Sequence, residues 1–426
     1  MEGQKMSWMV RGIAKVYSMV AAMLLCIVAT CSFSACQKDS DDPTPSPEDS
    51  KYAESRTVLV YMVAENSLNS KVYSDVAEML AGMKDVTLYP EDRLVLYVDD
   101  VQMPRFYVID KNTEALTLTD LTPALEYKED VNSASGDELG KALEQAKKLC
   151  PAKSYGLVMW SHAIGWIPSA SWTPSAAKPR RTFGVDNGRN TSVNDGPEME
   201  IADMARALES KDTLDFILFD ACSMQSIEVA YELRNATKYL VASPAEIPGP
   251  GAYYTTMVKA LFKRDNYAEA ILQAYYDYYT TVVTKYGLVM SIVKTSALPA
   301  FASYMKTVVA EHREELLEAD YSGVLNYLYA SWTNYIHPDF YDVQGIMKMM
   351  MDEDEFAQWK QEMAKVATCK HASGWYSIYN NKINPIDDAQ CSGVAMHVPR
   401  SVYERSRLHL NEAYLETDWA KAVWKE

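Results

Sequence analysis

The stretch LDFILFDACSMQSIEVAYEL, residues 214–233, decides the fold class of this chain. Its first six residues, 214–219, are a short apolar run of the kind that forms a strand covered on both faces. A polar segment follows, and residues 227–233 then carry apolar side chains at helical spacing. A second apolar run comes next, at residues 238–242. The order strand, loop, helix, strand predicts a parallel α/β unit.

The same alternation extends towards the amino terminus. Apolar runs typical of strands occur at 56–64, 93–98, 106–109 and 155–160, and helical patterns occur at 69–83, 135–149 and 201–208. Ser135 and Glu138 have the spacing of a capping box at the start of one of these helices. We therefore predict an α/β fold, with a mainly parallel sheet, helices on both faces, and ligand sites at the carboxyl ends of the strands.

The pattern changes after residue 254. The remaining part, 255–426, is richer in helical patterns and contains one further strand-like run at 288–293. Two more runs, at 374–379 and 393–398, are expected to form two strands joined by a loop that contains the turn-forming pair Asn384-Pro385. We predict a core at 57–254, followed by a helix-rich C-terminal region with added strands.

The amino terminus has the pattern of a secretory signal. Residues 1–36 begin with basic side chains, continue with the apolar residues 19–30 and end in small residues. That apolar run is shorter than the roughly 20 residues that a transmembrane helix needs. Residues 33–36 (FSAC) resemble a bacterial lipobox, so we expect Cys36 to carry lipid and to anchor the protein outside the cytoplasm at the outer membrane. Cleavage without lipidation is the alternative. Residues 37–56 are acidic and Pro-rich, which predicts a disordered tether.

Composition and charge narrow the classes of partner. The chain has 426 residues, of which 48% are hydrophobic and 23% charged, which is typical of a folded globular protein. Its net charge of −17 repels phosphate backbones and anionic membranes. We therefore expect no nucleic acid partner and no membrane contact except through the lipid, and a cationic peptide is favoured as ligand.

Two predicted strands run directly into residues with catalytic chemistry. The strand at 155–160 is followed by Ser161 and His162, and the strand at 214–219 by Asp220, Ala221 and Cys222. The exits of parallel strands lie on one edge of a sheet, so the imidazole and the thiol are expected to face each other. A thiolate is a nucleophile, and a nearby imidazole can return the proton to a leaving amine. On spacing alone, an inert buried cysteine and a surface histidine remain the alternative.

Four motifs add a family resemblance. TVLVYMVAENSL (57–68), WSHAIGW (160–166), FDACSMQSIEVAYEL (219–233) and YLVASPAEIPGPGAYY (239–254) resemble, in order, segments of the clostripain family of cysteine peptidases. The resemblance implies a caspase-like fold, with His162 as general base and acid and Cys222 as nucleophile. It also implies that Asp220 lies in a pocket for an Arg or Lys side chain, which a buried carboxylate would attract.

The chain departs from the family pattern at two positions near these motifs. Ala163 follows the histidine where family members usually have Gly, and its backbone amide is expected to help bind the oxyanion. Pro250 stands between two glycines where basic-selective members can carry an acid. We therefore expect Glu246 to assist Asp220 in binding a cation, and Glu65, which follows the first strand, to line the substrate groove.

The sequence offers no cofactor motif. Clostripain itself depends on calcium, but residues 186–196 lack the ligand order and the closing Glu of an EF-hand loop. The histidines outside the WSHAIGW motif have no metal-ligand spacing. From the residues alone no cofactor is expected, and only the family resemblance suggests a dependence on calcium.

The prediction is a monomeric cysteine endopeptidase that cleaves peptides or proteins after Arg or Lys. Two alternatives stay open. One is a catalytically impaired, peptidase-like surface lipoprotein that binds a peptide or glycan, and the other is a cysteine peptidase with a different selectivity.

The segment between the two catalytic motifs, 167–198, is rich in Ser, Pro, Asn and Gly and is expected to be an exposed loop. It contains Arg180, Arg181 and Arg189, after which we expect the enzyme to cut itself. An uncut loop is the alternative. Cys369 and Cys391 are 22 residues apart, and sequence alone does not decide whether they form a disulfide.

Overall fold

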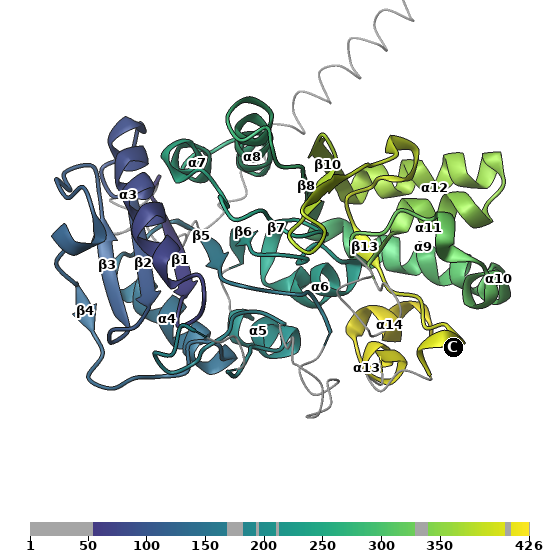
Figure 1. Cartoon of the computed structure of the whole chain (residues 1–426), viewed down its shortest axis with the longest axis horizontal. Helices are drawn as coiled ribbons and strands as arrows, with labels where there is room; N and C mark the ends of the chain where they lie inside the picture. The colour runs from purple at the N-terminus through teal and green to yellow at the C-terminus, as the bar shows by residue number, and fades with distance from the viewer. Residues whose placement is uncertain are drawn as a thin grey trace, which may run out of the picture. The chain divides into compact units, whose positions relative to one another are not determined.

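A nine-stranded sheet forms the centre of the computed structural model (Figure 1). The structure describes residues 54–167, 182–192, 196–209, 213–328, 340–404 and 410–425. The strand order is β10-β8-β7-β6-β5-β1-β2-β3-β4. The strands span Arg56–Val63 (β1), Arg93–Asp99 (β2), Arg105–Ile109 (β3), Leu125–Glu126 (β4), Ser154–Trp160 (β5), Leu214–Asp220 (β6), Thr237–Ala242 (β7), Leu288–Lys294 (β8) and Ala367–Ala372 (β10).

The five central strands, β7-β6-β5-β1-β2, are parallel, and the strands outside them are antiparallel to their neighbours. The parallel strands all end on one edge of the sheet. Side chains that follow β1, β5 and β6 are therefore brought together at that edge. This is the arrangement that the apolar runs predicted.

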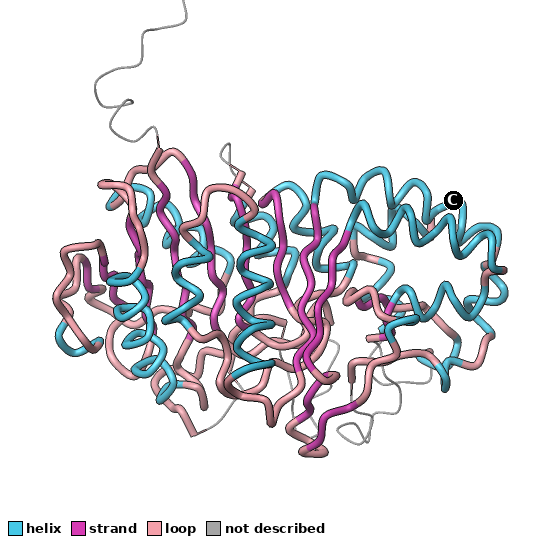
Figure 2. The backbone as a smooth tube through the Cα atoms, turned by 90° about the horizontal axis from the view of Figure 1, so that it is seen from above, coloured by secondary structure: helices cyan, strands magenta, loops and turns pink. Residues whose placement is uncertain are grey.

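Helices cover both faces of the sheet because the strands are apolar on both faces. In β1, Val58, Val60 and Met62 pack into one core, whereas Leu59 and Tyr61 pack into the other. The first core is closed by α3 (Asn69–Asp85), α7 (Tyr254–Leu261) and α8 (Tyr267–Thr281), and the second by α4 (Gly136–Leu149), α5 (Ile201–Leu208) and α6 (Ile227–Glu232), among others. Figure 2 shows the strands running side by side with helices lying over them. The predicted α/β class is confirmed.

The C-terminal region continues the sheet. β8 and β10 pair with the strands of the core, and residues 52–426 form one compact unit with no division at 254. Further helices are α9 (Leu298–Glu311), α10 (Arg313–Glu318), α11 (Val343–Met350), α12 (Glu353–Val366), α13 (Leu410–Leu415) and α14 (Asp418–Val423). Within the described ranges, none of the helices is both long and apolar enough to cross a membrane.

The two runs at the C-terminal end both contain a strand, and the segment between them contains a third, β12 (Lys382–Asn384). The runs at 374–379 and 393–398 do not pair with each other: β11 (Trp375–Ser377) pairs with β12, and β13 (Ala395–Met396) pairs with β9 (Tyr341–Asp342). Asn381, at a φ of 52°, closes the short turn between β11 and β12. Apolar runs indicate strands, but they do not specify which strands become partners.

Only one of the two hydrogen bonds of the expected capping box at α4 is present. The Ser135 side chain accepts a hydrogen bond from the Glu138 backbone amide, as predicted. The Glu138 carboxylate does not return to the Ser135 amide but accepts hydrogen bonds from the hydroxyls of Tyr97 and Tyr127. Tertiary contacts thus redirect the glutamate side chain.

Candidate active site

The exits of β5 and β6 place a histidine beside a cysteine. Trp160 of β5 pairs in register with Asp220 of β6, and the two strands are parallel. His162 and Cys222 each lie two residues beyond this pair. Both side chains are half-buried and line one cavity of about 580 Å³. The cavity is therefore the place where the predicted base and nucleophile meet.

His162 is held by a loop from the neighbouring strand. Its Nε2 lies 2.9 Å from the hydroxyl of Ser67, which follows β1 and also lines the cavity. The His162 carbonyl accepts a hydrogen bond of 2.8 Å from the Gly184 amide. The imidazole is thus positioned through its ring and through its backbone.

Cys222 is fixed by the loop after β7. The Ile247 amide donates to the Cys222 sulfur at 3.4 Å. The next residue, Ser223, has a φ of 58°, which is uncommon for a residue other than Gly, and its amide donates to the Ala245 carbonyl at 2.9 Å. This sharp turn directly after the strand leaves Cys222 lining the cavity.

Asp220 is a buried carboxylate of the same cavity. It accepts hydrogen bonds from the Ala252 amide at 3.2 Å and from the hydroxyls of Tyr254 and Tyr275, both at 2.9 Å. Burial raises the pKa of Asp220, and these three donors oppose the rise. Gly251 lies against the carboxylate: a Cβ there would come within 3.1 Å of Oδ2, and its φ of 62° also favours glycine.

A second carboxylate in the cavity was missed by the sequence analysis. Asp75 of α3 is 8% exposed and accepts a hydrogen bond of 2.8 Å from the indole nitrogen of Trp160. Burial, reinforced by the charge of Asp220, raises the pKa of Asp75 to about 7. An acidic residue beside Val72 and Val76 on the apolar face of a helix was the signal that could have found it.

Glu246 lines the cavity as expected, but its carboxylate already has two partners. It accepts hydrogen bonds from the Ser377 hydroxyl at 2.5 Å and from the Ile378 amide at 2.9 Å. Glu246 therefore ties the end of β11 to the cavity, and the exposed side chains of Ile378 and Tyr379 belong to the lining. Burial raises its pKa, and the two donors oppose this.

The two departures from the family pattern differ in their position. Ala163 is 6% exposed, lines the cavity, and forms an isolated β-bridge with Phe183. In the loop after β7, Gly249 and Gly251 line the cavity, whereas Pro250 is not among the lining residues. Pro250 thus lies in the loop beside the cavity but outside the surface that lines it.

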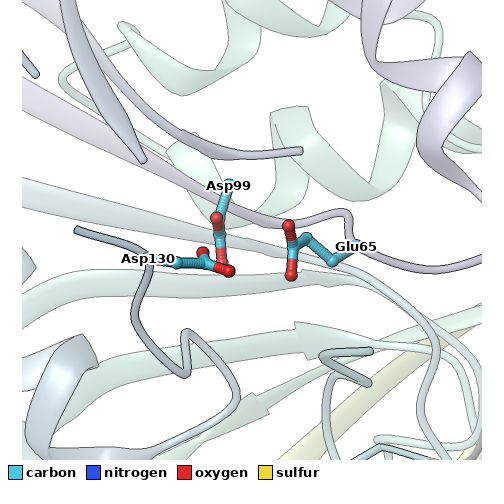
Figure 3. A group of neighbouring side chains, drawn as sticks. All are labelled: Glu65, Asp99 and Asp130. Atoms are coloured by element: carbon cyan, nitrogen blue, oxygen red, sulfur yellow. The ribbon is translucent and has the colours of Figure 1, made fainter. Parts of the chain in front are cut away.

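Glu65 does not lie where the sequence analysis expected it. It is fully buried, is absent from the lining of the catalytic cavity, and lies with Asp99 and Asp130, as Figure 3 shows. Burial raises the pKa of Glu65 and raises that of Asp99 to about 9. Glu65 misses the groove because its carboxylate lies beside the end of β2, whereas Ser67, two residues on, contacts His162. The three carboxylates are a candidate set of metal ligands.

Several predicted residues have no structural description. Cys36, Arg180 and Arg181 lie outside the described residues. Arg189 is exposed, has a φ of 71°, and forms an ion pair with Asp130 in which Nε and Oδ2 are 3.7 Å apart.

Cys369 on β10 and Cys391 are free thiols, with their sulfurs 3.7 Å apart. They are close enough that a small movement would let them bond. Both are separate from the catalytic cavity.

A parallel sheet with helices on both faces, and a cysteine and a histidine at adjacent strand exits, define the class of caspase-like cysteine peptidases. The sequence model of the clostripain family matches residues 60–404, and the chain belongs to that family.

Two solved structures are similar over most of the chain. A secreted C11 cysteine protease from Bacteroides thetaiotaomicron, in complex with an irreversible peptide inhibitor, is 27% identical, with a TM-score of 0.69 over 87% of this chain and 99% of that one. An inactive zymogen C11 protease from Parabacteroides distasonis is 26% identical, with a TM-score of 0.70 over 87% of this chain and 98% of that one. The expected fold and family are confirmed by these comparisons.

Clostripain from Hathewaya histolytica is 27% identical over 218 residues. That match covers 46% of this chain and 40% of clostripain, so less than half of either protein is aligned.

Proposed function

We propose that this protein is a cysteine endopeptidase that cleaves peptides or proteins after Arg or Lys. The observation that carries the proposal is the cavity itself, in which His162 and Cys222 lie beside two buried carboxylates, Asp220 and Asp75. Nucleophile, base and an acidic pocket are the three parts that such an activity requires.

In the proposed reaction, the Cys222 thiolate attacks the scissile carbonyl carbon, and the imidazolium of His162 gives its proton to the leaving amine. The peptide C–N bond breaks and a thioester remains on the enzyme. His162 then removes a proton from water, which attacks the thioester, so that the acid product leaves and the thiolate is restored.

Selectivity for a cation follows from charge in the pocket. Asp220 is satisfied by hydrogen bonds from three donors, and Asp75 accepts one from Trp160. A guanidinium or ammonium group between them would relieve the repulsion that helps to raise the pKa of Asp75. Glu246, engaged with Ser377, would act at the rim rather than at the base of the pocket.

The proposal extends to location and activation. A protein with a lipobox at Cys36 would be anchored outside the cytoplasm, and one of its structural relatives is described as secreted. The relative from Parabacteroides distasonis is described as an inactive zymogen, which supports a cleavage step in activation. We place that step after Arg180, Arg181 or Arg189.

A panel of fluorogenic peptides that differ only in the residue before the cut tests the activity, with wild type beside Cys222→Ala. We expect hydrolysis after Arg and Lys by wild type alone. An irreversible thiol-directed peptide probe provides a second readout. Failure of wild type to hydrolyse the peptides or take up the probe would favour a binding protein, and hydrolysis after other residues would favour a different selectivity.

A further inference from the structure

Two free thiols lie next to each other at an edge of the nine-stranded sheet. Cys369 is on the edge strand β10, and Cys391 follows the short helix Asp388–Gln390. Their sulfur atoms are 3.7 Å apart, and both side chains are partly exposed, so a small molecule can reach them. The sulfurs of a disulfide are about 2.0 Å apart. Rotation of the two side chains by a small amount therefore suffices to bring the sulfurs to bonding distance.

The space that the Cys369 sulfur occupies is kept open by a glycine. A Cβ at Gly393 would lie 2.4 Å from this sulfur and 3.0 Å from the Cβ of Ser291, so a larger residue would displace them. Gly393 also has a φ of 72°, which favours glycine. The backbone at Gly393 thus leaves the Cys369 sulfur in contact with Cys391.

The backbone directly after Cys391 is held by a buried carboxylate. Asp342 is 0% exposed and accepts hydrogen bonds from the amides of Ser392 and Gly393, both at 2.9 Å. It also accepts a hydrogen bond of 2.7 Å from the hydroxyl of Tyr327, which lies 3.5 Å from the Cys391 sulfur. Cys391 is therefore held in a fixed position beside β10.

The thiol pair is connected to the loop of the catalytic cysteine. Ser291 of β8 is the register partner of Cys369, and its hydroxyl donates to the Gly393 carbonyl at 2.6 Å. Gln225, fully buried and three residues after Cys222, donates through Nε2 to the Ser291 carbonyl at 2.8 Å. The Gln225 carbonyl accepts from the amide at position 395 at 3.0 Å. The two thiols thus belong to the two segments that hold Gln225 in place.

We propose that Cys369 and Cys391 form a disulfide under oxidising conditions, and that this bond clamps the two segments that support the loop of Cys222. The pair lies outside the catalytic cavity, so the bond leaves the nucleophile free. Export from the cytoplasm, as proposed above, would bring the pair into a compartment in which disulfides persist.

The bond forms by thiol–disulfide exchange with a small-molecule disulfide such as oxidised glutathione. The Cys391 thiolate attacks one sulfur of that molecule, its S–S bond breaks, and one thiol leaves as a mixed disulfide forms. The Cys369 thiolate then displaces the second thiol, and an S–S bond joins the two residues. Two electrons pass to the small molecule, and the protons of the two cysteine thiols end on the two released thiols.

Cys391 is the thiol that attacks first. The contact with Cys391, together with burial, raises the pKa of the Cys369 thiol well above its usual range, so Cys369 has the smaller fraction of thiolate.

Peptide mapping tests the bond on full-length Cys222→Ala protein, in which neither the catalytic thiol nor self-cleavage interferes. The folded protein is incubated with reduced or with oxidised glutathione, its remaining thiols are blocked, and it is then unfolded and digested after Lys and Arg. The two cysteines fall in separate peptides, 366–370 and 383–400, so a linked pair of these peptides identifies the disulfide.

We expect the linked peptides only after treatment with oxidised glutathione. The oxidised protein should melt a few degrees higher than the reduced protein, because a cross-link restricts the unfolded chain. Amide hydrogen exchange at 223–226 and 392–396 should be slower in the oxidised protein. Cys391→Ser should remove the link and both differences. Cys150→Ala is the matched control, because it also loses one thiol but keeps the pair, and it should behave as the parent protein does.

The comparison of two redox states of one chain keeps the test decisive even if a variant does not fold. Absence of the linked peptides, their appearance only after unfolding, or a link from either residue to another cysteine would overturn the disulfide. Linked peptides with unchanged melting temperature and exchange would refute the clamp. These readouts do not involve peptide hydrolysis, so the thiol pair and the proposed activity can fail separately.

Discussion

Trp160 of β5 and Asp220 of β6 are paired in register in the parallel sheet, and each is followed two residues later by a catalytic candidate. The same pairing brings two buried carboxylates to one cavity. The Trp160 indole donates a hydrogen bond to Asp75, and Asp220 is the residue of β6 that pairs with Trp160. One register relationship thus sets the positions of His162, Cys222 and the buried carboxylate Asp220 relative to one another.

Replacement of either member of the dyad should abolish hydrolysis. Cys222→Ala removes the nucleophile and His162→Ala the base, so we expect kcat/KM to fall by at least about a thousandfold in each. Circular dichroism and melting temperature should match wild type, because both side chains are only half-buried. A folded Cys222→Ala protein that kept most of its activity would refute the assignment.

The two pocket carboxylates should matter for basic substrates only. Asp220→Asn and Asp75→Asn each remove a charge that a cationic side chain would meet, which costs about 1.5 to 3 kcal/mol, or roughly ten- to a hundredfold in kcat/KM. Substrates with Leu before the cut should lose much less. Asp85→Asn, at the exposed end of α3, is the control. Equal losses on Arg and Leu substrates would exclude a role in selectivity.

Asp75 should also make stability depend on pH. Its pKa is raised from 3.8 to about 7 by burial. Below about pH 4 the carboxyl is protonated in both the folded and the unfolded chain. There its contribution to the free energy of unfolding is at its most favourable. As the pH rises towards 7, the unfolded chain ionises first, so the free energy of unfolding falls, by an amount on the order of a few kcal/mol. Urea denaturation at pH 5 and pH 8 should show a smaller fall for Asp75→Asn than for wild type, and parallel falls would contradict the assigned shift.

A buried ion pair should stabilise the opposite edge of the sheet. Arg56, 2% exposed, donates to Asp215 at 2.6 Å and to the carbonyl of Leu261 at 3.0 Å. Asp215→Ala would leave the guanidinium buried without its partner, which typically costs about 3 to 5 kcal/mol. Chemical denaturation measures this loss. Lys238→Ala is the comparison. Lys238 also pairs with Asp215, but its side chain is 57% exposed, so its loss should lower the free energy of unfolding by less than about 1 kcal/mol.

Self-cleavage should divide the chain between β5 and β6. Arg189 is exposed in the loop that joins the two catalytic segments, and Arg180 and Arg181 precede it in the sequence. The fragments should stay together, because β5 of one pairs with β6 of the other. Intact-mass analysis of wild type and Cys222→Ala should find the cut in wild type only. The same cut in both would indicate a foreign protease, and an uncut active wild type would rule out the step.

The sequence alone predicted the parallel centre of the sheet and placed the two candidate catalytic residues at its strand ends, whereas β4 and β10 of the same sheet were not predicted. Strands and helices can be recognised from the apolar pattern of a few neighbouring residues. The apolar runs of β1, β5 and β6 therefore identified these strands, and the candidate residues are those that directly follow them in the chain. The placement of Cys222 and His162 at one cavity was therefore predictable from segments of a few residues each.

Only the tertiary structure decided which other side chains join them. Asp75 reaches the pocket because α3 packs across the sheet against the indole of Trp160, 85 residues away. Glu65 turns away from the groove and meets Asp99 and Asp130, which come from two other segments. The partners of β11 and β13 were undetermined for the same reason. The spacing of apolar residues along a segment indicates whether it is a strand or a helix and which of its faces is buried. Contacts between distant segments depend on how the helices and strands pack, and no local sequence pattern specifies that packing.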